Sequence, residues 1–297
     1  MIAKTGLLAV AVAVLAWPGE SWAETWEVPQ DFATIQQAIN SPDVRDGDVI
    51  EVGPGKFRGA RITKSVKIRG SGYTRIVGGP RIWRGRDYEA GFLFRGPKAE
   101  NGSGAEIYNF IFDGVEFPIF ASQWGAVVYG VKVQNNSIEN AIQGITMWHA
   151  DDWDVRYNVI NNLRAVSGGG IGILVGTYSG DDAFENRVSE NDITGTVTVD
   201  PADTGGYNAA GVFIVSDHRG KKVGGLVEGN FVSSNTISLV SDRPDVVPVV
   251  GVDITDTRGW TKRNKITENV VTNNDISGTE HDVELTPIKL DDVNNVQ

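Results

Sequence analysis

A three-residue phrase recurs from residue 109 onward and constrains the fold more than any other feature of this chain. The phrase is asparagine, any residue, then isoleucine or valine, and it begins at Asn109, Asn136, Asn158, Asn191, Asn235 and Asn274. Asparagine tolerates the left-handed backbone of a tight turn, and its amide can hydrogen-bond an identical amide about 4.8 Å away in the next strand. The recurrence predicts a solenoid with asparagines stacked at one corner and aliphatic residues inside. The alternative is that the asparagine row binds a ligand.

Two further sequence phrases recur in the same repeat units as the first. A second asparagine stands five residues before three of the repeats, at Asn186, Asn230 and Asn269. A glycine followed by apolar residues comes later in each unit, at Gly144, Gly172, Gly211 and Gly251, and residues 288–290 are predicted to be a fifth copy. Such short apolar runs predict strands. The extra residues of the longer units fall between the asparagine and glycine phrases, which predicts loops along one face, where repeat proteins bind ligands.

Composition excludes several classes of protein. The chain of 297 residues contains no cysteine, which excludes disulfides, thiolate zinc sites, iron–sulfur clusters and cysteine nucleophiles. Its formal net charge of −11 argues against a nucleic-acid partner, because nucleic-acid-binding proteins normally carry a basic excess. Its 36 glycines favour many turns over long helices.

The first residues resemble a targeting segment. Lys4 precedes an apolar run at residues 6–17, which Pro18 ends and the small-x-small sequence of residues 21–23 follows. This pattern predicts a signal peptide at residues 1–23, cleaved near Ala23, and a secreted or periplasmic protein with a single domain at residues 24–297. The alternative is an uncleaved interfacial anchor. The run is too short to span a bilayer of about 30 Å, and no transmembrane segment is predicted elsewhere.

The sequence before the repeats resembles a known superfamily. Residues 34–39 (TIQQAI), residues 46–52 (DGDVIEV) and the Pro54-Gly55 turn are similar to the opening of right-handed parallel β-helix proteins of the pectin-lyase-like superfamily. The asparagine coils resemble those of periplasmic copper-site maturation proteins and related carbohydrate-binding β-helix repeats. The resemblance implies an all-β fold, namely a single-stranded right-handed parallel β-helix with a short N-terminal capping helix.

Polar and aromatic residues follow the glycine phrases, and equivalent positions of adjacent coils are expected to lie side by side. Paired carboxylates can divide acid and base roles in glycoside cleavage, arginine can stabilise developing charge, and aromatic rings stack on sugars. Aspartates also cap turns, and for them that is the simpler explanation. The predicted catalytic residues are Asp151, Asp152, Asp181, Asp182, Asp217, His218 and Arg219, and the predicted substrate-binding residues are Trp148, His149, Trp153, Tyr178 and Arg258.

The motifs leave two function classes open. The chain lacks the Gln-Asp-Thr-Leu motif of pectin methylesterases, the Gly-His-Gly motif of polygalacturonases and the Trp-Ile-Asp-His stretch of pectate lyases. The preferred hypothesis is an exported protein that binds a polysaccharide on its loop-lined face and cleaves it as a lyase or a glycoside hydrolase. The competing hypothesis is a non-catalytic periplasmic or surface protein, either a metal-site accessory or an adhesive scaffold.

Cofactors and assembly are weakly constrained. Copper fits poorly, because there is no cysteine, Met147 is the only methionine beyond the signal peptide, and the three histidines are scattered. Ca²⁺ is the one ion that the acidic composition suggests, since it could bridge the protein to an acidic sugar. The sequence identifies no metal ligands, and it leaves open the oligomeric state and what covers the C-terminal coil.

Overall fold

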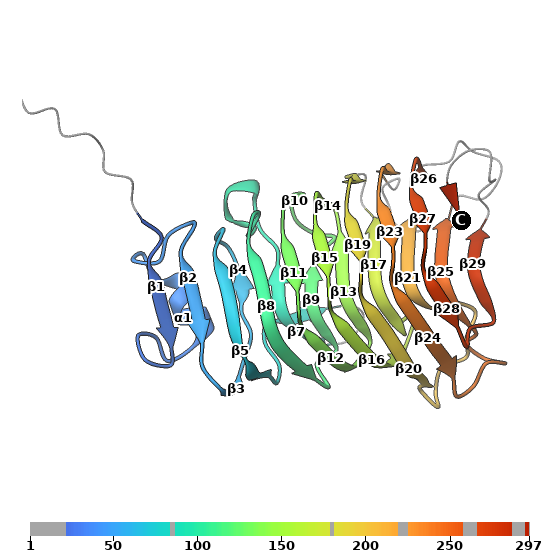
Figure 1. Ribbon diagram of the computed structural model, residues 1–297, viewed down its shortest axis with the longest axis horizontal. Coiled ribbons are helices and arrows are strands. Elements are labelled where there is room, and N and C mark those ends of the chain that lie inside the picture. Colours follow the sequence, from blue (N-terminus) through green and yellow to red (C-terminus); the bar gives the residue numbers. More distant parts are fainter. Residues whose placement is uncertain are drawn as a thin grey trace, which may run out of the picture.

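Strands stacked in parallel register make up nearly all regular structure of this protein (Figure 1). The computed structural model describes residues 22–83, 87–178, 181–218, 225–257, 266–286 and 295–296. Strands of successive coils pair in parallel along the whole axis, apart from one antiparallel hairpin. The chain is therefore an all-β parallel β-helix, as the repeats predict.

Each complete coil contributes one strand to each of three faces. Face 1 contains β1 (Thr25–Val28), β2 (Val49–Val52), the first parts of β5 (Lys67–Ile76) and β8 (Glu106–Asp113), β11 (Lys132–Gln134), β15 (Asp154–Arg156), β19 (Arg187–Ser189), β23 (Phe231–Ser233), β27 (Val270–Thr272) and β30 (Asn295–Val296). Face 2 contains β3 (Gly55–Phe57), the second parts of β5 and β8, β12 (Ser137–Ala141), β16 (Val159–Ala165), β20 (Asp192–Val199), β24 (Thr236–Ser241) and β28 (Asp275–Ser277). Face 3 contains β4 (Arg61–Ile62), β7 (Asp87–Phe94), β9 (Phe117–Ala121), β13 (Gln143–Trp148), β17 (Ile171–Thr177), β21 (Ala209–Ser216), β25 (Val249–Asp256) and β29 (His281–Thr286).

The remaining elements are short. The antiparallel hairpin joins β6 (Arg81–Trp83) to β7. Between face 3 and face 1, a narrow fourth side is formed by β10 (Val128–Tyr129), β14 (Ala150–Asp151), β18 (Ala183–Phe184), β22 (Val227–Glu228) and β26 (Ile266–Thr267). A 3-10 turn, η1 (Lys98–Glu100), follows β7. No helix in the described part of the chain has the length and apolar character needed to cross a membrane.

A short helix, α1 (Ile35–Asn40), lies in the segment that resembles the superfamily opening. Thr34 begins it by accepting a hydrogen bond from the backbone N–H of Gln37 at 3.1 Å. Ile35, Ala38 and Ile39 fall on one side of the helix and are buried in the interior cluster beside the first coils.

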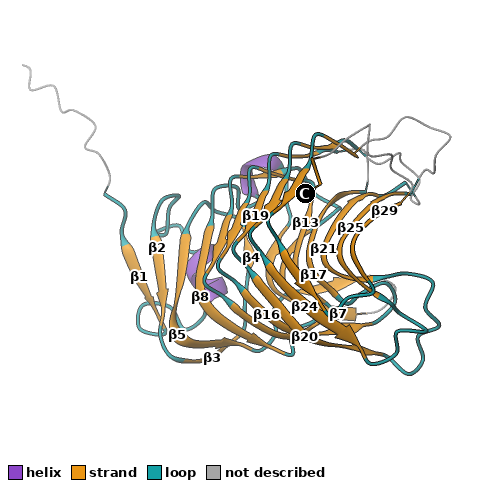
Figure 2. Ribbon diagram, turned by 45° about the vertical axis from the view of Figure 1, so that its right-hand side comes forward, coloured by secondary structure: helices purple, strands orange, loops and turns teal. Residues whose placement is uncertain are grey.

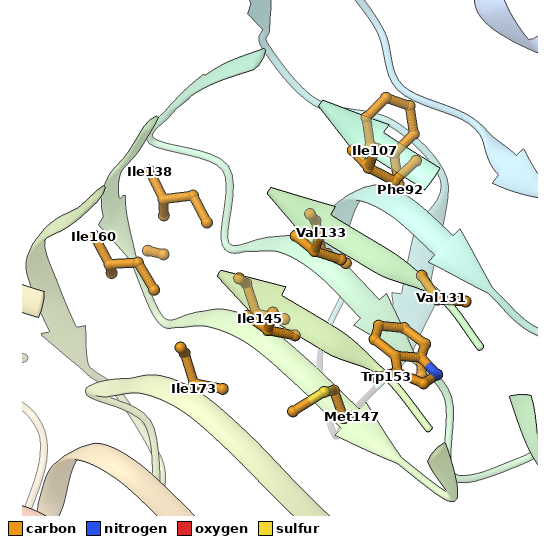
Figure 3. Close-up of a cluster of buried hydrophobic side chains, with 14 of the residues drawn as sticks. Phe92, Ile107, Val131, Val133, Ile138, Ile145, Met147, Trp153, Ile160 and Ile173 are labelled. Atoms are coloured by element: carbon orange, nitrogen blue, oxygen red, sulfur yellow. The ribbon is translucent and has the colours of Figure 1, made fainter. Parts of the chain in front are cut away.

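The interior is filled by aliphatic residues from every face. Alternation along face 3 points Ile145 and Met147 inward, and the same positions of the next coils are occupied by Ile173 and Val175. Trp153 also lies inside, beside Met147 (Figure 3). The period-2 pattern of the sequence therefore corresponds to rows of buried side chains spaced by one strand.

Two asparagine ladders run along the corners. In the ladder between faces 1 and 2, each side-chain amide donates to the side-chain carbonyl of the next asparagine at 2.9–3.0 Å, in the order Asn136, Asn158, Asn191, Asn235 and Asn274. The ladder between the fourth side and face 1 consists of Asn186, Asn230 and Asn269. These amides are engaged by one another and by backbone carbonyls, so the asparagines have a structural role.

The first predicted repeat is out of register by one residue. β8 pairs with β12 so that Ile111 faces Ser137, which places Phe110, and not Asn109, opposite Asn136. The backbone N–H of Phe110 donates to the Asn136 side chain at 3.1 Å. Asn109 instead has a positive φ of 62° and occupies the preceding turn position. The phrase matched by chance because both turn positions accept asparagine.

The predicted fifth glycine phrase is also misplaced. The strand that stacks on β25 is β29, in which Val283 faces Val252, so Asp282 takes the position opposite Gly251. Residues 287–294, which include the predicted copy at 288–290, lie outside the described residues. An aspartate in place of the glycine hid this coil from the sequence pattern.

The glycine column itself is sterically required. A methyl group on Gly211 would lie 2.5 Å from Ile237 Cγ2 and 2.8 Å from the carbonyl oxygen of Gly251. We expect Gly211→Ala to lower the free energy of unfolding by about 1–3 kcal/mol, as overpacking does. Urea denaturation measures this, and Gly125→Ala, whose methyl group would be no closer than 3.4 Å to any atom, is the control. Equal midpoints for the two variants would contradict the steric role.

The outer side of face 3 carries a second apolar cluster. Its buried members come from the same strands as the inward-pointing residues and include Tyr88, Phe117, Phe120, Trp148, Ile171, Leu174 and Val215. Figure 2 shows β17, β21, β25 and β29 curving side by side, with long loops at the lower right. Described loops at residues 200–208 and 242–248 precede face 3 strands, as predicted. Face 3 thus differs from the polar outer faces of the other strands.

Candidate functional site

One outward column of face 3 changes from apolar to acidic along the axis. Neighbouring strands pair Phe120 with Thr146, and the column continues through Leu174, Phe213, Asp253 and Glu284. Phe213 is half-buried beside Asp253, which is only 5% exposed, and Glu284 is half-buried on the other side. This places an aromatic ring next to a pair of carboxyl groups on adjacent strands.

Asn208 connects the two carboxyl groups. Its Nδ2 donates to Asp253 Oδ2 at 3.2 Å and to Glu284 Oε2 at 3.0 Å. Thr255 Oγ1 donates to the other oxygen, Asp253 Oδ1, at 2.6 Å. Because both bridged oxygens lie within 3.2 Å of one nitrogen, they are no more than about 6 Å apart, near the carboxyl separation of retaining glycosidases.

The environment of Asp253 favours its protonated form. Burial, helped by the negative charge of Glu284, raises the pKa of Asp253 to about 6, against the opposing effect of the hydrogen bonds from Thr255 and Asn208. Asp253 can therefore hold a proton at mildly acidic pH. A carboxylic acid of this kind is suited to general acid catalysis.

Three aromatic residues gather at the rim of face 3, where the strands end. Trp124, Trp148 and Tyr178, here called the aromatic group, come from three successive coils. The ring of Tyr178 is 5.4 Å from that of Trp124 and 6.4 Å from that of Trp148, both edge to face. Trp124 is 55% exposed, whereas Trp148 is buried beneath the group. Beside Tyr178, which is predicted to contact sugars, Trp124 therefore provides the exposed aromatic surface.

His149 supports this group from inside. Its side chain is fully buried, its Nε2 accepts the backbone N–H of Tyr178 at 3.2 Å, and its Nδ1 is 3.4 Å from Asp181 Oδ2. Burial lowers the pKa of His149, while the charges of Asp181 and Asp182 act in the opposite direction. The predicted substrate contact is thus a buried residue that holds Tyr178 and not a group exposed to ligand.

The predicted carboxylates of the fourth side act largely as turn caps. Asp151 Oδ1 accepts the backbone N–H of Phe184 at 2.9 Å, and Asp182 Oδ1 accepts that of Leu226 at 2.6 Å. Asp152 has a positive φ of 56° in an exposed turn. Burial, helped by neighbouring acidic groups, raises the pKa of Asp151 to about 6 despite its hydrogen bond from Phe184.

An acidic hollow lies over these turns. It has a volume of about 500 Å³ and is lined by Tyr129, Asp151, Asp152, Phe184, Glu185, Glu228, Gly229 and Glu268. Within the described residues, no group of three or more histidine, aspartate or glutamate side chains is placed to hold a metal ion. Met147 is buried in the core. Ca²⁺ remains a prediction without a ligand set.

Burial bears on two other predictions and corrects the first of them. Trp153 is 1% exposed, packs edge to face on Phe94 at 5.2 Å and donates its indole N–H to the carbonyl of Val128 at 2.9 Å, so it belongs to the core and is no sugar platform. Asp217 is 3% exposed. Its carboxyl is about as buried as that of Asp253, which is 5% exposed, so burial alone does not decide its predicted role.

His218 lies in a buried polar cluster on the next coils. Its Nε2 is 2.9 Å from Ser216 Oγ and 3.4 Å from Asp256 Oδ1. Ser216 is fully buried, and its hydroxyl donates to the carbonyl of Gly225 at 2.9 Å, so it is not exposed to a substrate as a nucleophile. Arg219 and Arg258 lie outside the described residues.

The sequence prediction thus identified some of the neighbouring residues of the site and missed others. It placed His149, Tyr178 and Asp181 side by side, which the structure shows. It missed Glu284 and Asn208, and it missed Trp124. In the Trp124 coil, Pro118 occupies the position of the glycine phrase, since Ile119 pairs with Ile145. Reading that position by strand register would have aligned Trp124 with the later coils.

Comparisons with known proteins give structural neighbours alone. No protein-family model matches the sequence, and no curated protein matches it. The mannuronan C-5 epimerase AlgE4 A-module of Azotobacter vinelandii is 13% identical, with 90% of this chain and 96% of that chain covered and a TM-score of 0.28. The tailspike protein of E. coli bacteriophage HK620 is 14% identical over 86% of this chain and 48% of its own, with a TM-score of 0.37.

A third similar structure is the alginate lyase of Paenibacillus sp. str. FPU-7. It is 12% identical, with 89% of this chain and 99% of that chain covered and a TM-score of 0.24. This chain spans about half the length of the tailspike protein. The assignment of the fold rests on the strand register of the chain itself.

Proposed function

We propose that this chain is an exported protein that binds a polysaccharide along face 3 and cleaves it as a glycoside hydrolase. The observation that carries the proposal is the pair Asp253 and Glu284, bridged by Asn208 beside the half-buried ring of Phe213. Aromatic rings stack on sugar faces, and paired carboxyl groups accept hydroxyl hydrogen bonds and exchange protons. Export is supported by the apolar segment within residues 1–23.

The two carboxyl groups divide the chemistry. Asp253, which burial keeps protonated at mildly acidic pH, donates its proton to the glycosidic oxygen as the bond from that oxygen to the anomeric carbon breaks. Glu284, the more exposed of the two, attacks the anomeric carbon as a carboxylate. Water then releases the sugar, and Asp253 recovers a proton from it. The short separation of the pair favours this double displacement, which retains the anomeric configuration.

The aromatic group extends the site along the axis. Tyr178 directly follows β17, and Asp253 lies in β25, two coils further along. Each coil advances about 4.8 Å, so the two are roughly 10 Å apart along the axis. Tyr178 also lies four residues beyond Leu174, which shares the column of Asp253, an offset of about 13 Å along the strand direction. A chain of several sugars that crosses face 3 obliquely contacts both.

The proposed function is tested with the full chain against a panel of neutral and uronic-acid polysaccharides. Hydrolysis yields new reducing ends, whereas a lyase also yields unsaturated products that absorb in the ultraviolet. New reducing ends without that absorbance, from at least one polysaccharide that binds, support the proposal. Binding without any turnover would support the adhesive scaffold instead, and failure to bind any member of the panel would overturn both.

Removing the exposed ring of the aromatic group is expected to weaken binding. Trp124→Ala takes away the largest exposed apolar surface at the rim, and we expect the dissociation constant for the bound polysaccharide to rise about tenfold, as for loss of an aromatic anchor. Calorimetric titration measures the change. Tyr73→Ala, which removes a 78% exposed ring near the N-terminal coils, is the control and should bind like the unaltered protein. Equal loss in both variants would contradict a specific site.

A further inference from the structure

A buried histidine links the protonation state of the interior to the position of the aromatic group. His149 is fully buried, with its backbone at a φ of 51°. Its backbone N–H donates to the carbonyl of Gly176 at 3.0 Å, and its carbonyl accepts the N–H of Val128 at 3.0 Å. These bonds fix the backbone of the residue between two neighbouring coils, and the complete burial of its side chain leaves the ring little room to turn away from Tyr178.

The contact with Tyr178 requires one particular form of the ring. A backbone N–H cannot accept a hydrogen bond, so His149 Nε2, 3.2 Å from the Tyr178 nitrogen, must present a lone pair. In the neutral imidazole the proton then resides on Nδ1, which faces Asp181 Oδ2 at 3.4 Å. The structure therefore corresponds to neutral His149.

We propose that His149 is a proton-controlled positioning residue, which holds Tyr178 in the aromatic group when neutral and releases it when Nε2 takes up a proton. Protonation places two N–H groups against each other at the Tyr178 contact. The backbone of Tyr178 must then move, and its ring, which packs edge to face on Trp124 and Trp148, moves with it. The consequence for ligand binding rests on the proposed function, whereas the motion of Tyr178 does not.

The surrounding charges set the direction of the pH effect. Burial lowers the pKa of His149 below its ordinary value of 6.5, while Asp181 and Asp182, which face the ring from the next turn, favour the charged form. Because the unfolded chain takes up the proton first, the neutral histidine stabilises the fold fully above about pH 6.5. That contribution is lost progressively as the pH falls below this value.

The test follows Tyr178 and His149 directly in the ligand-free protein. In a ¹⁵N-labelled sample, we expect the His149 ring nitrogens to show unprotonated Nε2 at about pH 7.5, and the Tyr178 amide signal to shift with the same midpoint as the ring on acidification. Intrinsic tryptophan fluorescence should change at that midpoint, since Trp124 and Trp148 contact Tyr178. Protonated Nε2 at neutral pH, or titration of the ring without a change at Tyr178, would overturn the proposal.

A substitution of His149 distinguishes a proton-controlled positioning role from a purely structural one. In His149→Gln the side-chain carbonyl can accept the Tyr178 N–H but does not titrate, so the pH-dependent shift at Tyr178 should disappear. His281→Gln, which alters an exposed histidine on β29, should keep it. If His149→Gln does not fold, the titration of the unaltered protein decides alone.

The link to ligand binding is measured separately. In an Asp253→Asn background, which removes turnover and the titration of Asp253, polysaccharide affinity should fall at least threefold between about pH 7 and pH 5, and His149→Gln should remove that dependence. If the Tyr178 signal titrates with His149 but the protein binds none of the polysaccharides tested, the positioning role is upheld and the proposed function is overturned. If the protein binds a polysaccharide but the Tyr178 signal does not titrate with His149, the proposed function is upheld and the positioning role is overturned.

Discussion

Replacing Asp253 with asparagine is expected to lower the rate of polysaccharide hydrolysis by about 10²–10⁴-fold, the contribution of a positioned general acid. Asparagine has nearly the same shape but no proton to donate. The unaltered protein should lose activity as the pH rises above about 6, because deprotonation of Asp253 then removes the acid, whose pKa burial raises to about 6. Initial rates of reducing-end release across the pH range measure both effects.

The same substitution distinguishes chemistry from stability. A buried carboxyl whose pKa is higher in the folded than in the unfolded chain destabilises the fold at a pH above both values, where it must be ionised. Asp253→Asn should therefore unfold at a higher temperature than the unaltered protein at pH 8, while being far less active. Asp275→Asn, an exposed carboxylate on face 2 of the neighbouring coil, is the control and should retain full activity. Undiminished hydrolysis by Asp253→Asn would exclude it as the acid.

Replacing Asn191 with alanine should lower the free energy of unfolding by about 3–5 kcal/mol. Asn191 Oδ1 accepts from both the backbone N–H and the side-chain amide of Asn158 at 3.0 Å, and Asn191 Nδ2 donates to Asn235 Oδ1 and to the carbonyl of Val155. Alanine leaves these partners buried without their bonds, and each unsatisfied buried group costs about 1–3 kcal/mol. Urea denaturation followed by circular dichroism measures the loss.

Two variants calibrate this effect. Asp192→Ala changes the next residue, which is exposed, and should be nearly neutral. Asn274→Ala changes the last member of the ladder, which is half-buried, and should cost less than Asn191→Ala because water can reach the freed groups. A loss of the same size at all three positions would contradict a ladder whose strength depends on burial.

The fold could be predicted because its determinants repeat along the sequence. Asn158 and Asn191 occupy equivalent corners, and each repeats the same local bonds to the next coil. The prediction was wrong at Asn109 because a one-residue shift still matches an asparagine phrase, and strand pairing alone identifies Phe110 as the ladder position. Register between coils is a long-range property that a local pattern does not contain.

The site was harder to predict than the fold because its residues come from positions without a shared phrase. Asn208 lies in a loop that precedes β21, and Glu284 lies on a strand where Asp282 replaces the repeating glycine. Burial also reversed the expectations for His149 and Trp153, whose side chains are 0% and 1% exposed and lie inside the protein. The aspartates of the fourth side served the simpler purpose that turn chemistry predicts.

The register between coils fixes the spacing of sites along the axis. Distances between sites on face 3 change in whole strand spacings, and the unit from Asn136 to Asn158 is 22 residues long. Duplicating such a unit between the aromatic group and Asp253 would move them apart by about 4.8 Å without altering either. Under the proposed function, the number of coils between the aromatic group and Asp253 would set the length of polysaccharide that spans the two.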